Sequence, residues 1–138
     1  MTTSPSITPP ASPRAFVGVP AAWAALVLVL TLTPAQEMPN TPQWDLLSFD
    51  TAAHAGVFAV LAFTSYISAR RQRRFPTLRR QALWWVGLGC TLFGALIEVL
   101  QMTMDLGRHG EWSDLISDTL GTVAGLGAAW LLRRWWQA

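Results

Sequence analysis

Three ionisable residues lie inside long apolar stretches of the 138-residue sequence: His54, Glu98 and Asp118. A charged side chain at the centre of a bilayer costs about 2.5 to 3.5 kcal/mol even on the milder insertion scales, so such residues usually face one another or a water-filled cavity. An imidazole can serve as a base, and a carboxylic acid as an acid, on a substrate held between them. These residues are therefore the candidates for chemistry, with His54 and Glu98 as the candidate catalytic pair.

The apolar stretches themselves predict transmembrane helices. Only 13% of the residues are charged and 51% are apolar, whereas about 25% charged residues is typical of soluble domains. The stretches have close to the ~20 residues that an α-helix needs to cross a bilayer, and segments of that length satisfy their backbone in lipid only as helices. They span residues 15–33, 51–69, 82–101 and 115–132. We therefore expect an all-α membrane protein, a bundle of four transmembrane helices forming one domain over residues 14–138.

The first 13 residues are rich in Ser, Thr and Pro and lack the apolar groups needed to pack, so they are predicted to be a disordered cytoplasmic leader. The first apolar stretch is also compatible with a cleaved signal peptide that begins at Arg14 and ends at Thr33-Pro34-Ala35. Its length exceeds the usual ~7 to 15 residues of a signal core, which favours a retained span.

The distribution of charge predicts the orientation. Basic residues near the ends of spans stay on the cytoplasmic side, and nine of the ten basic residues fall on one side of the predicted bundle: Arg14, Arg70, Arg71, Arg73, Arg74, Arg79, Arg80, Arg133 and Arg134. All eight acidic residues fall on or toward the other side, where Arg108 is the only basic residue. The predicted topology is therefore N-in and C-in, in a bacterial cytoplasmic membrane.

The arginine-rich loop at residues 70–81 also resembles a phosphate-binding patch of a nucleic-acid-binding protein. Because the topology already requires these arginines, we expect no nucleic-acid partner. Each arginine near the surface adds about 1 kcal/mol of attraction to anionic headgroups, so membrane lipids are the expected partners.

The three buried ionisable residues share one depth. His54, Glu98 and Asp118 each lie about one helical turn, or ~6 Å, inside the outer end of their span. Asp50 and Asp114 lie at the expected starts of the second and fourth spans, where carboxylates cap helices. His54, Glu98 and Asp118 could ligate a metal ion, but no paired-His spacing supports this, so neither a metal nor another cofactor is expected.

Two predicted helix faces carry these residues. On the third span, the helical repeat places these residues on one face: Gly87, Thr91, Gly94, Glu98 and Gln101. On the fourth span, the same repeat places these residues on one face: Asp114, Asp118, Gly121, Gly125 and Ala128. Gly121 and Gly125 form a GxxxG pair, which permits close helix approach in lipid. We expect the third and fourth spans to pack through Gly94 and this pair.

Three motifs together resemble the VanZ-like family of small bacterial membrane proteins: Asp50-x3-His54-x3-Phe58, Glu98-x2-Gln101 and Arg108-x5-Asp114-x3-Asp118-x2-Gly121-x3-Gly125. Thr51 and Asp118 depart from the pattern, which usually has Lys and Asn there. The resemblance implies a function in the cell envelope, and the family is named for a protein that confers low-level resistance to the glycopeptide-type antibiotic teicoplanin.

The motif residues predict an outer-facing polar pocket, with these ligand-binding residues: Asp50, His54, Glu98, Gln101, Arg108, Asp114 and Asp118. For two of them a structural role is open: Arg108 could pair with acidic residues of its own loop, and Gln101 could cap the third span. The pocket fits a module that binds a lipid-linked or cell-wall component, an intramembrane enzyme acting on a lipid-linked substrate, or a small proton-coupled transporter. No Ser or Cys nucleophile adjoins His54 and no phosphate-cradling glycine loop is present, so binding without catalysis is favoured.

Overall fold

The computed structural model describes residues 17–34, 49–104 and 112–136. These parts of the chain contain helices and no strand: α1 (Gly18–Thr31), α2 (Phe49–Arg71), α3 (Pro76–Arg80), α4 (Ala82–Thr103), α5 (Trp112–Leu131) and α6 (Arg133–Trp136). The all-α expectation is therefore confirmed for the described residues. The predicted leader at residues 1–13 lies outside them.

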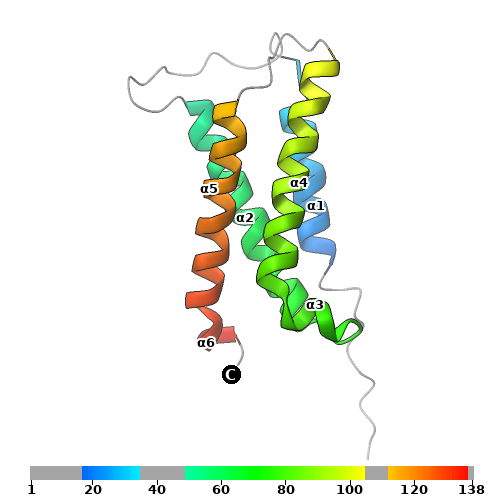
Figure 1. Ribbon diagram of the computed structural model, residues 1–138, viewed down its shortest axis with the longest axis vertical. Coiled ribbons are helices and arrows are strands. Elements are labelled where there is room, and N and C mark those ends of the chain that lie inside the picture. The colour runs from blue at the N-terminus through cyan, green and yellow to red at the C-terminus, as the bar shows by residue number, and fades with distance from the viewer. Residues whose placement is uncertain (1–16, 35–48, 105–111, 137–138) are drawn as a thin grey trace, which may run out of the picture.

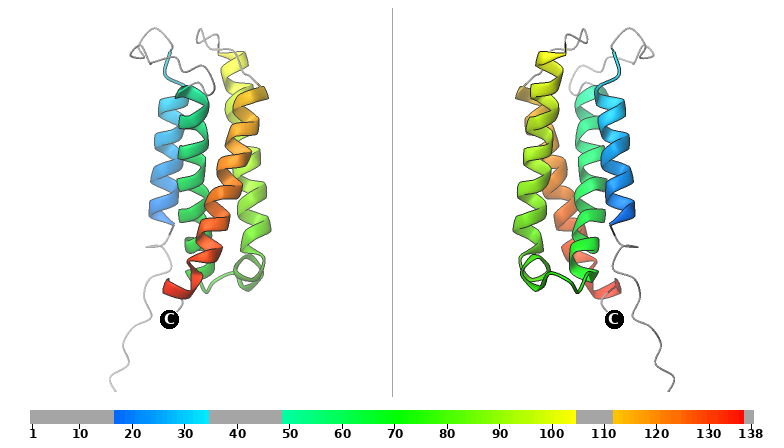
Figure 2. Two further views of the ribbon diagram at one scale, coloured as in Figure 1. Left: turned by 90° about the vertical axis from the view of Figure 1, so that its left-hand side faces the viewer. Right: turned by 90° about the vertical axis from the view of Figure 1, so that its right-hand side faces the viewer.

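The four long helices form an up-and-down bundle (Figure 1). α1 and α4 run toward the end at which α2 and α5 begin, while α3 and α6 lie at the opposite end. α2 is central, since it contacts α1, α4 and α5, and α1 lies alongside it (Figure 2). For brevity, the end where α2 and α5 begin is called the acidic end, and the end with α3 and α6 the arginine end.

The surface of the bundle is apolar and part of its interior is polar. Leu92 on α4 and Leu120 on α5 are 60% and 64% exposed, whereas Gln101 and Asp118 are 2% and 1% exposed. This is the reverse of a water-soluble helix bundle and suits lipid outside with polar groups paired inside. By length and composition, α2 and α4 can each cross a membrane, and α1 is a shorter apolar helix.

The buried face of α4 is partly different from the predicted one. Gly94, Glu98 and Gln101 are buried as expected, but Val86 and Cys90 are buried nearer the start of the helix. Thr91, expected on this face, is exposed, and its hydroxyl donates to the carbonyl oxygen of Gly87 in the same helix at 3.0 Å. A threonine whose hydroxyl is satisfied by its own helix can face lipid, so its polarity did not indicate burial.

The predicted loop at residues 70–81 contains the short helix α3, and Gln72 closes the turn before it. The Gln72 side chain accepts from the main-chain N–H of Phe75 and donates to the Phe75 carbonyl, both at 2.8 Å. Pro76 then occupies the first turn of α3, where its missing N–H costs nothing. The connection between α2 and α4 is thus a hydrogen-bonded turn followed by a short helix, rather than an irregular loop.

Two long-range hydrogen bonds attach α1 to the rest of the bundle. The indole of Trp23 donates to the carbonyl oxygen of Val57 on α2 at 2.9 Å, and the amide of Gln101 on α4 donates to the carbonyl oxygen of Thr31 at 2.9 Å. Both acceptors are main-chain oxygens, so α1 is positioned by side chains of its neighbours and by its own Trp23 without any ion pair in these two contacts.

Candidate functional site

The site rests on a close contact between α2 and α5. The Ser117 hydroxyl donates to the carbonyl oxygen of Thr51, and the main chain at Gly121 packs on Ala55. Gly125 packs on the main chain at Ala59 one turn further along. In each pair the two residues are 66 positions apart, so the two parallel helices stay in register over about two turns.

Gly121 and Gly125 are therefore packing residues, but against α2 rather than α4. A Cβ atom at Gly121 would lie 2.8 Å from the Cα atom of Ala55, and one at Gly125 would lie 2.9 Å from the Cα atom of Ala59. The expectation that this pair contacts the Gly94 face of α4 is wrong. The partner surface is the small-residue stripe of α2, where alanines allow the two backbones to meet.

At the acidic end this register brings together His54 and two carboxylates of α5. His54 Nδ1 lies 2.9 Å from Asp118 Oδ1, at hydrogen-bonding distance, and His54 Nε2 lies 3.9 Å from Asp114 Oδ2. The side chains of His54 and Asp118 are 4% and 1% exposed. An imidazole with a proton on Nδ1 donates to Asp118 and keeps Nε2 as an acceptor, whereas the imidazolium is attracted to both carboxylates.

Asp118 has a second oxygen that faces α4. A Cβ atom at Gly94 would lie 3.0 Å from Asp118 Oδ2, so any larger residue would press on this carboxylate. Within the described residues, Oδ2 is buried and makes no hydrogen bond. Gly94 is thus a packing residue as predicted, and its partner is the Asp118 side chain rather than a glycine of α5.

Glu98 and Gln101 lie on the same buried face of α4. Glu98 is one turn beyond Gly94 toward the acidic end and is 7% exposed. Gln101 contacts α1, because its side-chain amide donates a hydrogen bond to the carbonyl oxygen of Thr31. The structure therefore assigns Gln101 a structural contact between helices, and neither of the two roles considered for it, ligand donor or cap of α4, describes that contact.

The other predicted ligand residues have different outcomes. Asp114 is the third residue of α5, which begins at Trp112, and it faces His54 from the first turn of the helix. Asp50 is the second residue of α2, and its side chain lies outside the described part. Arg108 also lies outside it.

Sequence reasoning missed Ser117, which adjoins Asp118 on the wide buried stripe of α5 and could have been found from that spacing.

Across the described ranges, no group of three or more His, Cys, Asp or Glu side chains is placed to hold a metal ion. Asp114 and Asp118 place two carboxylates beside the His54 imidazole, and Glu98 lies on the buried face of α4, one turn from the Gly94 that lies against Asp118. Carboxylates accept hydrogen bonds and attract cations. We call His54, Glu98, Asp114 and Asp118 the acidic cluster.

No curated protein and no solved structure matches the chain. The family model described as VanZ/LLP1 matches residues 10–133. The match includes every helix that positions the acidic cluster and the α2–α5 contact, and it agrees with the motifs at Asp50, Glu98 and Arg108. The chain belongs to the VanZ/LLP1 family.

Proposed function

We propose that α1, α2, α4 and α5 all cross the bacterial cytoplasmic membrane, with both chain termini in the cytoplasm. α5 has 20 residues, a length of about 30 Å, and the two carboxylates that lower its hydropathy are buried in the bundle. Exposed Trp112 marks the acidic end, and exposed Trp84 and Trp135 mark the arginine end, as interfacial aromatic belts do. The arginine end then faces the cytoplasm.

Cysteine labelling in intact cells tests this topology. In a Cys90→Ser background, we expect a cysteine at Met104 to react with a membrane-impermeant thiol reagent and a cysteine at Arg74 to react only after the cells are lysed. Both positions are exposed at helix ends. The nearby Gln72 is not suitable as a labelling position, because its side chain closes the turn before α3. Labelling of Arg74→Cys in intact cells contradicts the orientation.

We propose further that the acidic cluster binds a lipid-linked or cell-wall component at the outer face of the membrane. The observation that carries this proposal is the buried His54–Asp118 contact with Asp114 at 3.9 Å. Hydrogen bonds between membrane helices average only ~0.6 kcal/mol, which is less than the insertion cost of these residues. The Ser117, Gly121 and Gly125 contacts already join α2 to α5, so packing does not require the ionisable groups.

The charge of the acidic cluster indicates which part of such a ligand it recognises. Two carboxylates of α5 lie beside a single imidazole, and Glu98 adds a third carboxyl group on the buried face of α4. This excess of carboxyl groups favours hydroxyl, amide and ammonium donors over phosphate. The sugar and peptide portions of a lipid-linked wall precursor carry such donors and project from the outer leaflet. The Asp114 side chain is 11% exposed, against 4% for His54, so Asp114 is the expected point of first contact.

Binding to the protein in nanodiscs tests the proposal, with a polyprenyl-linked disaccharide pentapeptide as the probe. We expect Glu98→Gln and Asp114→Asn to weaken binding about tenfold or more, because each loses a charge-assisted hydrogen bond worth about 1.5 to 3 kcal/mol. Thr103→Ala is the control, since Thr103 is exposed at the same end and bonds only within α4 in the described contacts. Unchanged affinity in both folded cluster variants would reject the proposal.

A hydrolytic or transfer activity is the second candidate, and the His54–Asp118 contact favours it. A carboxylate bonded to Nδ1 holds an imidazole in one tautomer and stabilises its protonated form, which lets Nε2 act as a general base. Incubation of the same probe with the protein separates the two functions. Consumption of the probe that depends on His54 supports an enzyme, and intact, bound probe supports a binding module.

A further inference from the structure

The arginine end of the bundle carries a large positive charge in segments that contain no acidic side chain. No Asp or Glu occurs in residues 55–97 or 119–138, which together supply eight arginines. The carboxylates of the described helices lie at the opposite end, in the first turns of α2 and α5 and near the end of α4. Counter-charge for these arginines must therefore come largely from outside the described chain.

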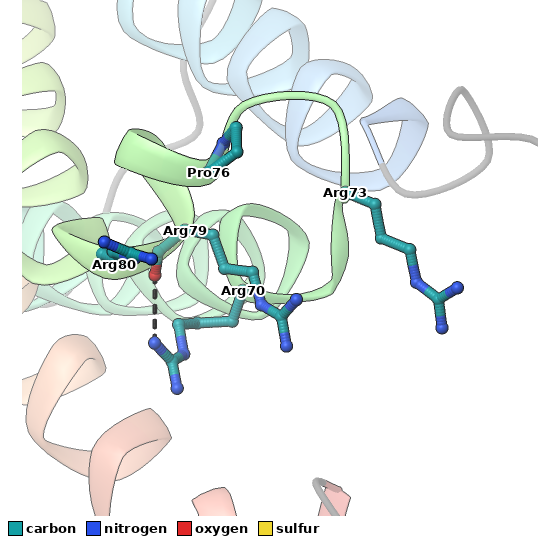
Figure 3. A pocket seen from close by; sticks show the side chains of 5 residues that line it. All are labelled: Arg70, Arg73, Pro76, Arg79 and Arg80. Carbon is teal, nitrogen blue, oxygen red and sulfur yellow. Dashed lines mark hydrogen bonds between the residues drawn. The ribbon is translucent and has the colours of Figure 1, made fainter.

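Four of these arginines line one hollow of about 340 Å³, which is lined by Arg70, Arg73, Pro76, Arg79 and Arg80. Figure 3 shows their side chains around the α2–α3 turn, with Arg70 reaching the carbonyl oxygen of Arg79. That hydrogen bond, at 3.0 Å, fixes the Arg70 guanidinium in place. Its Nε atom is buried and makes no hydrogen bond to any described residue.

A second hollow of about 200 Å³ shares Arg70 and Arg80 with the first, and aromatic and aliphatic side chains line it together with arginines. Tyr66, Leu83 and Trp130 are among these side chains. It lies at the arginine end of the bundle, where α2 and α5 end and α4 begins. Basic hollows with aromatic and aliphatic side chains beside the arginines match an amphiphile, whereas a free anion would need only the first hollow.

Arg133 extends the charge of the second hollow. It lines that hollow, and its guanidinium carbon lies 4.2 Å from the centre of the Trp130 ring. Stacking on the ring holds the guanidinium plane while leaving its edge N–H groups for an acceptor. The positive-inside rule requires basic residues on this side but not their convergence on a shared hollow.

We propose that the two hollows form one binding site for the phosphate headgroup of an anionic membrane lipid, with its glycerol and upper acyl chains against Tyr66, Leu83 and Trp130. Guanidinium groups bind phosphate through paired N–H donors, and basic pockets between transmembrane helices bind such headgroups. The site lies at the opposite end from the acidic cluster and does not depend on the function proposed for that cluster.

Native mass spectrometry in a neutral detergent tests the site without the diffuse attraction of a charged bilayer. Short-chain phosphatidylglycerol is the probe, and phosphatidylcholine is the zwitterionic comparison. We expect phosphatidylglycerol to be retained in preference, and Arg80→Gln to weaken its binding about fivefold, the change that the loss of one arginine contact implies. Arg74→Gln is the matched control: Arg74 lies 5.5 Å from the Phe75 ring and does not line either hollow.

Three outcomes overturn the proposal. Equal losses for Arg80→Gln and Arg74→Gln mean that only net charge matters. Displacement of the lipid by inorganic phosphate at the same concentration means that the site takes a free anion. Equal retention of both lipids means that the site does not select the net negative charge of an anionic headgroup. If Arg80→Gln does not fold, Arg133→Gln provides the test instead. Arg133 lines the second hollow and is not part of the α2–α3 turn.

Discussion

Adding one methyl group at Gly121 or Gly125 is expected to abolish assembly of the bundle. The new Cβ atom would meet the main chain of Ala55 or Ala59, and a helix backbone cannot move aside as a flexible side chain does. Overpacking typically costs about 1 to 3 kcal/mol, and a backbone obstacle places each substitution at or above the top of that range. The measurement is the fraction of monodisperse protein on size exclusion, with the thermal midpoint of what remains.

The same helix provides the control. Gly127 has no atom within 4 Å of a built Cβ and is exposed, so Gly127→Ala should behave like the parent or gain slightly from the helix propensity of alanine. Gly89→Ala on α4 is a second control of the same kind. If Gly125→Ala and Gly127→Ala have the same melting behaviour, the close α2–α5 contact is refuted.

The second large effect is expected at Asp118. We predict that Asp118→Leu lowers the free energy of unfolding by about 3 kcal/mol or more, because it leaves His54 buried without the carboxylate that lies 2.9 Å from Nδ1. Asp118→Asn keeps the shape and an acceptor oxygen for Nδ1, and it restores the residue usual in the VanZ-like pattern. We expect it to cost less than about 1 kcal/mol.

Unfolding by sodium dodecyl sulphate, followed by circular dichroism, measures both variants. A matched comparison is Leu120→Asn, which introduces the same side chain on the exposed face of α5, two positions from Asp118. If Asp118→Asn destabilises the protein as much as Asp118→Leu, the pair requires the charge of Asp118, and the Asn of the family pattern must be satisfied by other contacts.

Much of the helix arrangement could be predicted because the bilayer imposes length and polarity on each segment. Residues 51–69 and 82–101 lie within α2 and α4, and the apolar run at residues 115–132 predicts most of α5 although Asp118 interrupts it. The shared depth of His54 and Asp118 indicated their contact, since ionisable groups at one level in a bundle can pair at the lowest cost.

The partners of small and amide side chains could not be predicted in the same way. A GxxxG pair specifies close approach but not the helix that approaches, and the alternatives were Gly94 on α4 and the stripe of Ala55 and Ala59 on α2. The stripe has the same four-residue spacing and was overlooked. Gln101 donates to Thr31, 70 positions away, and no local pattern encodes that distance.

The register between α2 and α5 has a consequence for biogenesis. In the four-span topology proposed above, the helix inserted second finds its principal partner only when the last long helix leaves the ribosome, because paired residues are 66 positions apart. Until then the stripe of Ala55 and Ala59 faces lipid, and His54 has neither carboxylate of α5 beside it. A chain stalled before α5 is therefore an insertion intermediate in which the His54 imidazole lacks its carboxylate partners. Membrane quality-control proteases are suited to recognise such an exposed polar group in lipid.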